Sequence, residues 1–62
     1  MSIEKYIEKV MGRNDLSKDE MKSAMHEIMS GAIDEPDIIS FLISLKTKGE
    51  SIDEIIGAAE IL

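Results

Sequence analysis

An all-α domain, a small bundle of four short helices, is the fold that this sequence predicts. Apolar residues recur every three to four positions in four separate segments, which is the period of an amphipathic helix. No segment shows the alternation of apolar and polar residues that is typical of a half-buried strand. Ser, Gly and Pro stand between the four segments, where helices begin and end. We therefore expect one helical domain over residues 1–62, a length that leaves room for a single core.

Each expected helix has one apolar stripe and one charged face. The stripes are expected to pack inward, because a helix buries its apolar side against its neighbours. In chain order the stripes are Ile3, Tyr6, Ile7, Val10 and Met11; Met21, Ala24, Met25, Ile28 and Met29; Ile38, Phe41, Leu42 and Leu45; and Ile52, Ile55, Ala59 and Leu62.

Two capping boxes mark the starts of the second and fourth helices. Ser17 is followed three positions later by Glu20, and Ser51 is followed in the same way by Glu54. In such a box the Ser hydroxyl accepts a hydrogen bond from a free backbone N–H, while the Glu carboxylate accepts one from the backbone of the Ser. We expect both tight turns to be built in this way.

The bounds of the third helix are marked by residues with special backbone preferences. Gly31 is expected to end the second helix and Gly49 the third, since the residue after a helix often adopts the left-handed conformation that Gly tolerates best. Asp34 is a candidate N-cap, and Pro36 follows in the first turn, where its missing N–H costs little. Acidic residues at the start and lysines at the end match the dipole of this helix.

The stretch "KTKGESIDEI", residues 46–55, raises the question of a phosphate-binding loop. A phosphate loop needs several glycines, so that backbone N–H groups can surround the ligand, and usually a Lys after them. Here a single glycine, Gly49, follows the lysines. We interpret the stretch as a joint between two helices and assign no catalytic, cofactor-binding or metal-binding residue to the chain.

The composition excludes several classes of protein. A net charge of −6 would repel the phosphates of nucleic acids, so we expect no nucleic-acid partner. The longest uncharged stretch, residues 38–45, is far shorter than the ~20 residues of a membrane span, so we expect no membrane partner. No cationic segment leads into an apolar one as in a signal peptide, and cytoplasmic localisation is the simplest expectation. The chain has no Cys, and its one His, His26, is expected to be solvated.

The third helix carries a second, weakly polar face opposite its apolar stripe. The face consists of small or β-branched residues at the helical period, flanked by Ile39: Pro36, Ser40, Ile43 and Thr47. Four short helices cannot cover both sides of the third one, so we expect this face to meet a partner. A two-fold homodimer is the commonest solution.

The final residues "AAEIL" show no Gly, cation or cap, which helices usually have at their ends. We therefore expect the 62 residues to be a fragment of something longer.

Two stretches of sequence carry the pattern of a known family. They are "DLSKDEM", residues 15–21, and "IMSGAIDEPDIISFLISLKTKGESIDEIIGAA", residues 28–59. Together they resemble the N-terminal helical domain of the anthranilate phosphoribosyltransferases, whose pattern runs L-[ST]-x-x-E, then a glycine turn, then A-A-F-L-x-A-L-[RK]-x-K-G-E-[ST]-x-x-E-I-x-G. "KGES" with "EIIGAA" is the most discriminating part. The chain departs from the pattern at Ala32, where Glu is usual, and at Ile39 and Ser40, where Ala-Ala is common.

The resemblance implies that the 62 residues are an N-terminal fragment of a longer two-domain enzyme, and it implies an activity for that parent chain. Such enzymes transfer a phosphoribosyl group from phosphoribosyl pyrophosphate to anthranilate in tryptophan biosynthesis, with Mg²⁺ on the pyrophosphate. Their glycine-rich G-T-G-G-D motif and metal-binding residues belong to a larger C-terminal α/β domain, and no position here matches them. The small domain forms a wall of the interdomain cleft and makes homodimer contacts through its first and third helices. Tyr6 would then lie at the rim of that interface.

Two alternatives remain. The chain is either a free-standing acidic helical interaction module or the same domain of a related pyrimidine nucleoside phosphorylase. A G-T-G-G-D motif downstream of Leu62 would favour the phosphoribosyltransferase over a free-standing module.

Overall fold

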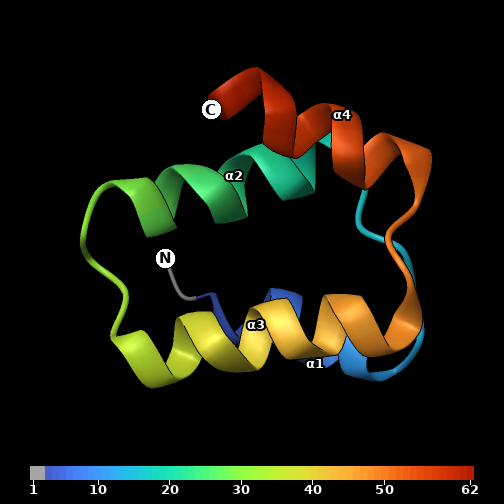
Figure 1. The fold of residues 1–62 in the computed structure, drawn as a ribbon, viewed down its shortest axis with the longest axis horizontal. Coiled ribbons are helices and arrows are strands. Elements are labelled where there is room, and N and C mark those ends of the chain that lie inside the picture. The colour runs from blue at the N-terminus through green and yellow to red at the C-terminus, as the bar shows by residue number, and fades with distance from the viewer. Residues whose placement is uncertain (1–2) are drawn as a thin grey trace.

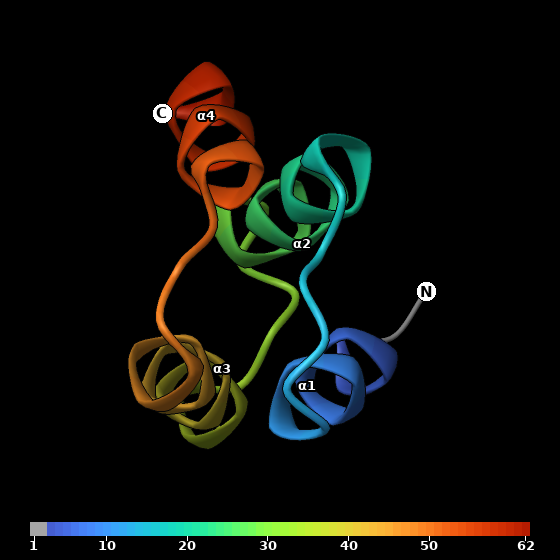
Figure 2. The same cartoon turned by 90° about the vertical axis from the view of Figure 1, so that its right-hand side faces the viewer.

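The computed structural model describes residues 3–62, and within them it contains four helices and no strand. The helices are α1 (Glu4–Met11), α2 (Lys18–Met29), α3 (Glu35–Lys48) and α4 (Ile52–Ile61). They form two layers, with α1 beside α3 in one and α2 beside α4 in the other (Figures 1 and 2). The predicted all-α bundle of four short helices is confirmed.

The core lies between the two layers. Phe41 and Ala24 have no exposed surface, and a residue of the α1–α2 loop, Leu16, is almost as deeply buried. Figure 2 shows the layers end on, with the connecting loops running between them. The buried apolar residues are Ile3, Tyr6, Ile7, Val10, Leu16, Met21, Ala24, Phe41 and Leu45. None of the helices in residues 3–62 has the length and apolar character that crossing a bilayer requires.

Both capping boxes are present. The Ser17 hydroxyl accepts a hydrogen bond from the Glu20 N–H at 3.0 Å, and the Glu20 carboxylate accepts one from the Ser17 N–H at 2.9 Å. Ser51 and Glu54 repeat the arrangement at 3.2 and 2.7 Å. Each box satisfies two backbone donors that the first turn of a helix leaves free.

Glycines with positive φ follow α2 and α3. Gly31 has φ +80° and Gly49 has φ +90°, which are backbone conformations that side chains with a Cβ rarely adopt. Asp34 is the N-cap of α3 by its extended backbone, although its side chain makes no capping hydrogen bond. Pro36 lies in the first turn of α3, at a position that needs no N–H donor.

The end of α1 differs from this pattern. Gly12 keeps a negative φ of −79°, and the following residue, Arg13, takes the left-handed conformation with φ +64°. The Arg13 N–H donates to the Val10 carbonyl and the Asn14 N–H to the Lys9 carbonyl, which closes the last turn of α1. This conformation costs roughly 1–2 kcal/mol for a residue other than Gly.

Three of the four stripes have the expected inner faces, but each carries an exposed residue. Met11, Met29 and Leu42 were expected in the core, and all three are exposed.

The prediction of which stripe of α4 is buried is wrong. Ile52, Ile55 and Leu62 are exposed, and so is Ala59. The buried residues of α4 are instead Glu54 and Gly57. Gly57 is needed there because a Cβ atom at this position would lie 2.6 Å from the Lys18 carbonyl oxygen of α2. Because α2 lies so close to α4, the glycine of α4 faces α2 and the isoleucines of α4 are exposed.

We expect Gly57→Ala to destabilise the domain by about 1–3 kcal/mol, the usual cost of overpacking a core contact. Ala favours an isolated helix over Gly by about 1 kcal/mol, so the clash with α2 has to reverse that preference. Urea unfolding followed by circular dichroism measures the change. Ala59→Gly, on the exposed face of α4, reports the helix preference alone. A Gly57→Ala variant more stable than the parent would contradict the close approach of α4 to α2.

Candidate functional site

The joint between α3 and α4 is built around a buried lysine. Lys48 has a side chain only 6% exposed, and its ammonium group donates three hydrogen bonds of 2.8 Å. The acceptors are the Asp15 carboxylate, the Gly49 carbonyl oxygen and the Glu54 carboxylate. An ammonium group has three N–H donors, so every donor of Lys48 is used within the domain.

Glu54 is the buried partner of this lysine, with no exposed surface. One of its oxygens accepts from Lys48 and from the Ser51 N–H at 2.7 Å. The other accepts from the Leu16 N–H at 2.7 Å. A single carboxylate therefore connects the α1–α2 loop, the end of α3 and the first turn of α4. We call Asp15, Lys48 and Glu54 the joint cluster.

The surroundings of Lys48 and Glu54 favour the charged form of each side chain. Burial by itself would raise the pKa of Glu54, but the hydrogen bonds from Lys48, Leu16 and Ser51 outweigh it and lower that pKa. Burial would likewise lower the pKa of Lys48, and the hydrogen bonds and charges of Asp15 and Glu54 outweigh it and raise that pKa. At the capping box of α2, hydrogen bonds from the Ser17 backbone and from Lys9 lower the pKa of Glu20.

This geometry shows what the "KTKGES" stretch does. A phosphate ligand would need the Lys48 ammonium group, which is enclosed and already bonded to two carboxylates and a carbonyl. It would also meet the negative charge of Asp15 and Glu54 at close range. The joint cluster fixes the angle between helices and leaves no donor for an anion.

The carboxylates of the chain do not fit a Mg²⁺ site either. Magnesium needs oxygen ligands that converge in near-octahedral geometry. Asp15 and Glu54 are bonded to Lys48, and Glu20 is bonded to Lys9 at 2.9 Å. Over residues 3–62 no group of three His, Cys, Asp or Glu side chains is arranged to hold a metal ion. His26 lies exposed on α2.

The expected partner face of α3 is exposed along its length. Ile43 is 60% exposed and Ile39 is 48% exposed, and Pro36, Ser40 and Thr47 are exposed as well. The placement of Tyr6 at the rim of this face is wrong. Tyr6 is only 5% exposed, because it points into the core and Lys5 lies over its ring. The exposed apolar residue that α1 contributes beside α3 is Met11.

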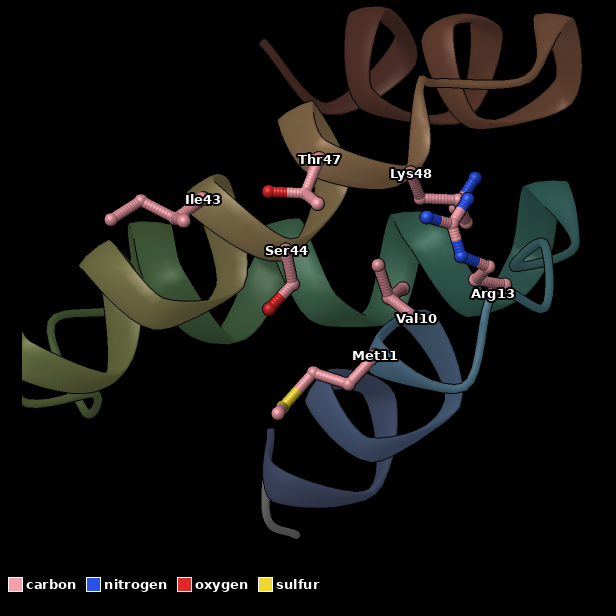
Figure 3. Close-up of a pocket in the computed structure, with 7 residues that line it drawn as sticks. All are labelled: Val10, Met11, Arg13, Ile43, Ser44, Thr47 and Lys48. Carbon is pink, nitrogen blue, oxygen red and sulfur yellow. The ribbon is translucent and has the colours of Figure 1, made fainter.

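A groove runs between α1 and α3 and consists of two open hollows that share Met11. The first, of about 350 Å³, is lined by Val10, Met11, Arg13, Ile43, Ser44, Thr47 and Lys48 (Figure 3). The second, of about 320 Å³, is lined by Glu4, Ile7, Glu8, Met11, Asp37 and Ser40. Figure 3 shows Met11 between the two helices, with Arg13 and Lys48 together at one end. We call the two hollows together the α1–α3 groove.

A second apolar surface lies on α4, on the opposite layer. It consists of the isoleucines and the leucine that face away from α2: Ile52, Ile55, Ile56 and Leu62. All four side chains are at least 40% exposed, although each is large and apolar. We call it the α4 face.

Sequence reasoning missed four residues that shape these features. The sequence pattern assigns Lys48 to a helix end and Glu54 to a cap. Their opposite charges, six positions apart across Gly49, are the signal that could have indicated an ion pair. Leu16 stood outside every stripe, and a lone Leu in a loop gives no periodic pattern. Nothing in the sequence indicates that Arg13, and not Gly12, takes the positive φ.

The helices, their order and the capped joint define a class of protein, a helical bundle domain. The chain belongs to the glycosyl transferase family, in which residues 4–62 match the helical bundle domain. All 62 residues are also similar to enzymes named anthranilate phosphoribosyltransferase. The identity is 40% with the enzyme of Pseudomonas entomophila, 42% with that of Pseudomonas syringae pv. tomato and 44% with that of Teredinibacter turnerae.

The chain is much shorter than these relatives. It is covered completely in each comparison, but it spans 18% of each relative's length. The matching part is the N-terminal region of those enzymes. No solved structure gives a significant match.

Substitution of Lys48 should destabilise the domain far more than substitution of a neighbouring lysine. We expect Lys48→Met to cost about 3–5 kcal/mol, because it leaves the Glu54 carboxylate buried without its cation. A domain of this length has a total stability of only about 3–9 kcal/mol, so much of the variant should be unfolded. Lys46→Met, two positions earlier and exposed, should stay within about 0.5 kcal/mol of the parent. Urea unfolding measures the stability of Lys48→Met and Lys46→Met. The same measurement on Glu54→Gln and on the double variant with Lys48→Met and Glu54→Gln gives the coupling energy between the two buried side chains. If the double variant loses as much stability as the two single variants together, Lys48 and Glu54 do not stabilise one another.

Stability should be highest between the ordinary pKa values of the two buried groups. The pKa of Glu54 is lowered from 4.5, so its contribution is complete above pH 4.5 and is lost as the pH falls through the folded value. The pKa of Lys48 is raised from 10.5, so its contribution is complete below pH 10.5 and is lost at higher pH. We expect a flat plateau with a decline on each side, measured as the urea midpoint against pH. Glu20→Gln removes the other carboxylate with a lowered pKa. If this variant no longer loses stability at low pH, the loss in the parent comes from Glu20 and not from Glu54.

Proposed function

We propose that this chain is the N-terminal helical domain of an anthranilate phosphoribosyltransferase. Such an enzyme transfers a phosphoribosyl group from phosphoribosyl pyrophosphate to anthranilate, in tryptophan biosynthesis in the cytoplasm. The observation that carries the proposal is identity of about 40% over all 62 residues with relatives of that name. The family match over residues 4–62 supports it.

The domain takes no chemical part in this reaction. Its buried lysine is neutralised by two carboxylates, and the carboxylates of Asp15, Glu20 and Glu54 are bonded to lysines or backbone N–H groups. Phosphoribosyl pyrophosphate and its Mg²⁺ ion therefore bind to the C-terminal α/β domain of the parent chain. The helical domain contributes one wall of the cleft in which anthranilate and the phosphoribosyl donor meet.

Its two exposed surfaces give the domain two partners. The α1–α3 groove and the outer side of α3 form the homodimer contact, with Ile39 and Ile43 as its apolar residues. The α4 face packs against the rest of the parent chain. Burying a side chain such as Ile52 or Ile55 stabilises that contact by roughly 1.5–3 kcal/mol when the side chain is fully removed from water. The relatives are several times longer than this chain, so they have enough further sequence to cover α4.

A chimeric enzyme tests the proposal directly. The matching region of the Pseudomonas syringae pv. tomato relative, which is 42% identical, is replaced by these 62 residues. We expect the chimera to form phosphoribosyl anthranilate and to support growth of a tryptophan auxotroph that lacks the enzyme, because the catalytic residues remain in the larger domain.

Two further chimeras serve as controls. An unrelated four-helix domain of the same length should give an inactive enzyme, since it lacks the surfaces that meet α4 and α3. The same exchange in a pyrimidine nucleoside phosphorylase should also lose activity. A first chimera that is folded but inactive, or a phosphorylase chimera that is active, would contradict the proposal.

A further inference from the structure

α4 takes little part in the hydrophobic core. Over residues 3–62 the buried apolar residues all lie between Ile3 and Leu45, before α4 begins. Ala58 is the one residue of α4 that packs against them, and it is only partly buried. Larger apolar side chains of α4, such as Ile52 and Ile55, are exposed. Burial of apolar surface, the dominant favourable term in folding, therefore holds α4 only weakly.

α4 is attached to the domain through its first two turns. In the first turn the Glu54 carboxylate accepts hydrogen bonds from Lys48 at 2.8 Å and from the Leu16 N–H at 2.7 Å. In the second turn Gly57 lies against the start of α2, where a Cβ atom would come within 2.6 Å of the Lys18 carbonyl oxygen. The contacts of Glu54 are the ones that join α4 to α3 and to the α1–α2 loop.

The far end of α4 is held less firmly. Glu60 forms an ion pair of 3.2 Å with Lys22 of α2, and these side chains are 42% and 39% exposed. Ion pairs of exposed side chains contribute little, because the charges interact through water and two long side chains lose freedom. Leu62 follows and is 80% exposed. The attachment of α4 therefore depends on its N-terminal half.

The anchor and the N-terminal cap of α4 share one oxygen atom. The Glu54 oxygen that accepts from Lys48 also accepts from the Ser51 N–H in the capping box. A helix of ten residues has too few internal hydrogen bonds to persist by itself in water. When Glu54 leaves its buried position, α4 therefore loses its hold on the domain at the end where the helix starts, and all of its turns are affected together.

The joint before α4 allows such an opening. Only Gly49, Glu50 and Ser51 separate α4 from α3. Gly49 has φ +90°, and beyond its chain neighbours no atom lies within 4 Å of the place that a Cβ would take. Residues at the end of a helix absorb the change in backbone angles when the next element moves, and a glycine in open space does so at little cost.

We propose that α4 opens as one unit: it leaves α2 and unwinds from the joint at Gly49 while α1, α2 and α3 stay folded, and the buried pair of Lys48 and Glu54 is the latch that keeps it closed. Elements with few buried apolar contacts open at the lowest free energy in a folded protein. The opening goes beyond the proposed function and does not depend on it. In the longer enzyme of that proposal, whatever covers the α4 face binds the helical state only and so favours closure.

Native-state hydrogen exchange of the 62-residue chain, followed amide by amide by NMR, tests the opening. We expect the amides of residues 55–61 to exchange at one common free energy, and on the order of tenfold faster than the most protected amides of α2. Low concentrations of urea should accelerate α2 steeply and α4 hardly at all, because opening of α4 exposes little surface.

Two outcomes of this experiment would overturn the proposal. One is equal protection of α4 and α2, which means that α4 opens only with the whole domain. The other is a gradient along α4, in which Ile55 is as protected as α2 and protection falls toward Ile61. Such a gradient is the sign of fraying from the end and not of a unit that opens at its latch.

A matched pair of mild variants separates opening of α4 from unfolding of the domain. Ile7→Val removes one methylene from the buried side of α1, which is folded whether α4 is open or closed. It should accelerate the slowest amides of α2 about fivefold and leave α4 unchanged. Ser51→Ala removes the hydroxyl that caps α4, which accepts from the Glu54 N–H at 3.2 Å. It weakens the closed state only, so it should accelerate α2 and α4 alike, again about fivefold. Equal acceleration of α2 and α4 by Ile7→Val would show that α4 has no opening of its own.

Discussion

The buried ion pair of Lys48 and Glu54 is the interaction on which the arrangement of the four helices depends. Moving two charges out of water costs several kcal/mol each, and this cost is offset only when the charges are paired and fully hydrogen-bonded. Here Lys48 uses three donors and Glu54 accepts from three different groups. The partners come from the α1–α2 loop, the end of α3 and the start of α4, so one pair connects the two layers of the bundle.

The same pair decides which surfaces the domain shows to its surroundings. Glu54 has to point inward to reach Lys48 and the Leu16 N–H, which sets the rotation of α4 about its axis. Gly57, one turn further on, then lies against α2 and lets the two helices approach closely. The isoleucines of α4 are left on the outside. The domain therefore shows exposed apolar side chains on α4 and a groove between α1 and α3.

The local features of the fold could be predicted from the sequence because they depend on neighbouring residues. The capping boxes at Ser17 and Ser51 and the glycine ends at Gly31 and Gly49 need only a hydrogen bond or a backbone angle a few residues away. The second face of α3, which is exposed, could be located from the helical period alone, and its partner stays a prediction. The helical period also placed Tyr6 in the inward-facing stripe of α1, where it is buried, whereas its expected place at an interface rim came from the resemblance to the family.

By itself the sequence determined four helices, their bounds, the two capped joints and the family of the protein. Each of these depends on short-range hydrogen bonds, backbone preferences or the order of motifs. Only the tertiary structure decided that Glu54 is buried and Ile55 is exposed, because that choice depends on a lysine and a backbone N–H brought together from distant parts of the chain. The apolar period of α4 predicted the opposite face, and the buried ion pair with the close packing at Gly57 outweighed it.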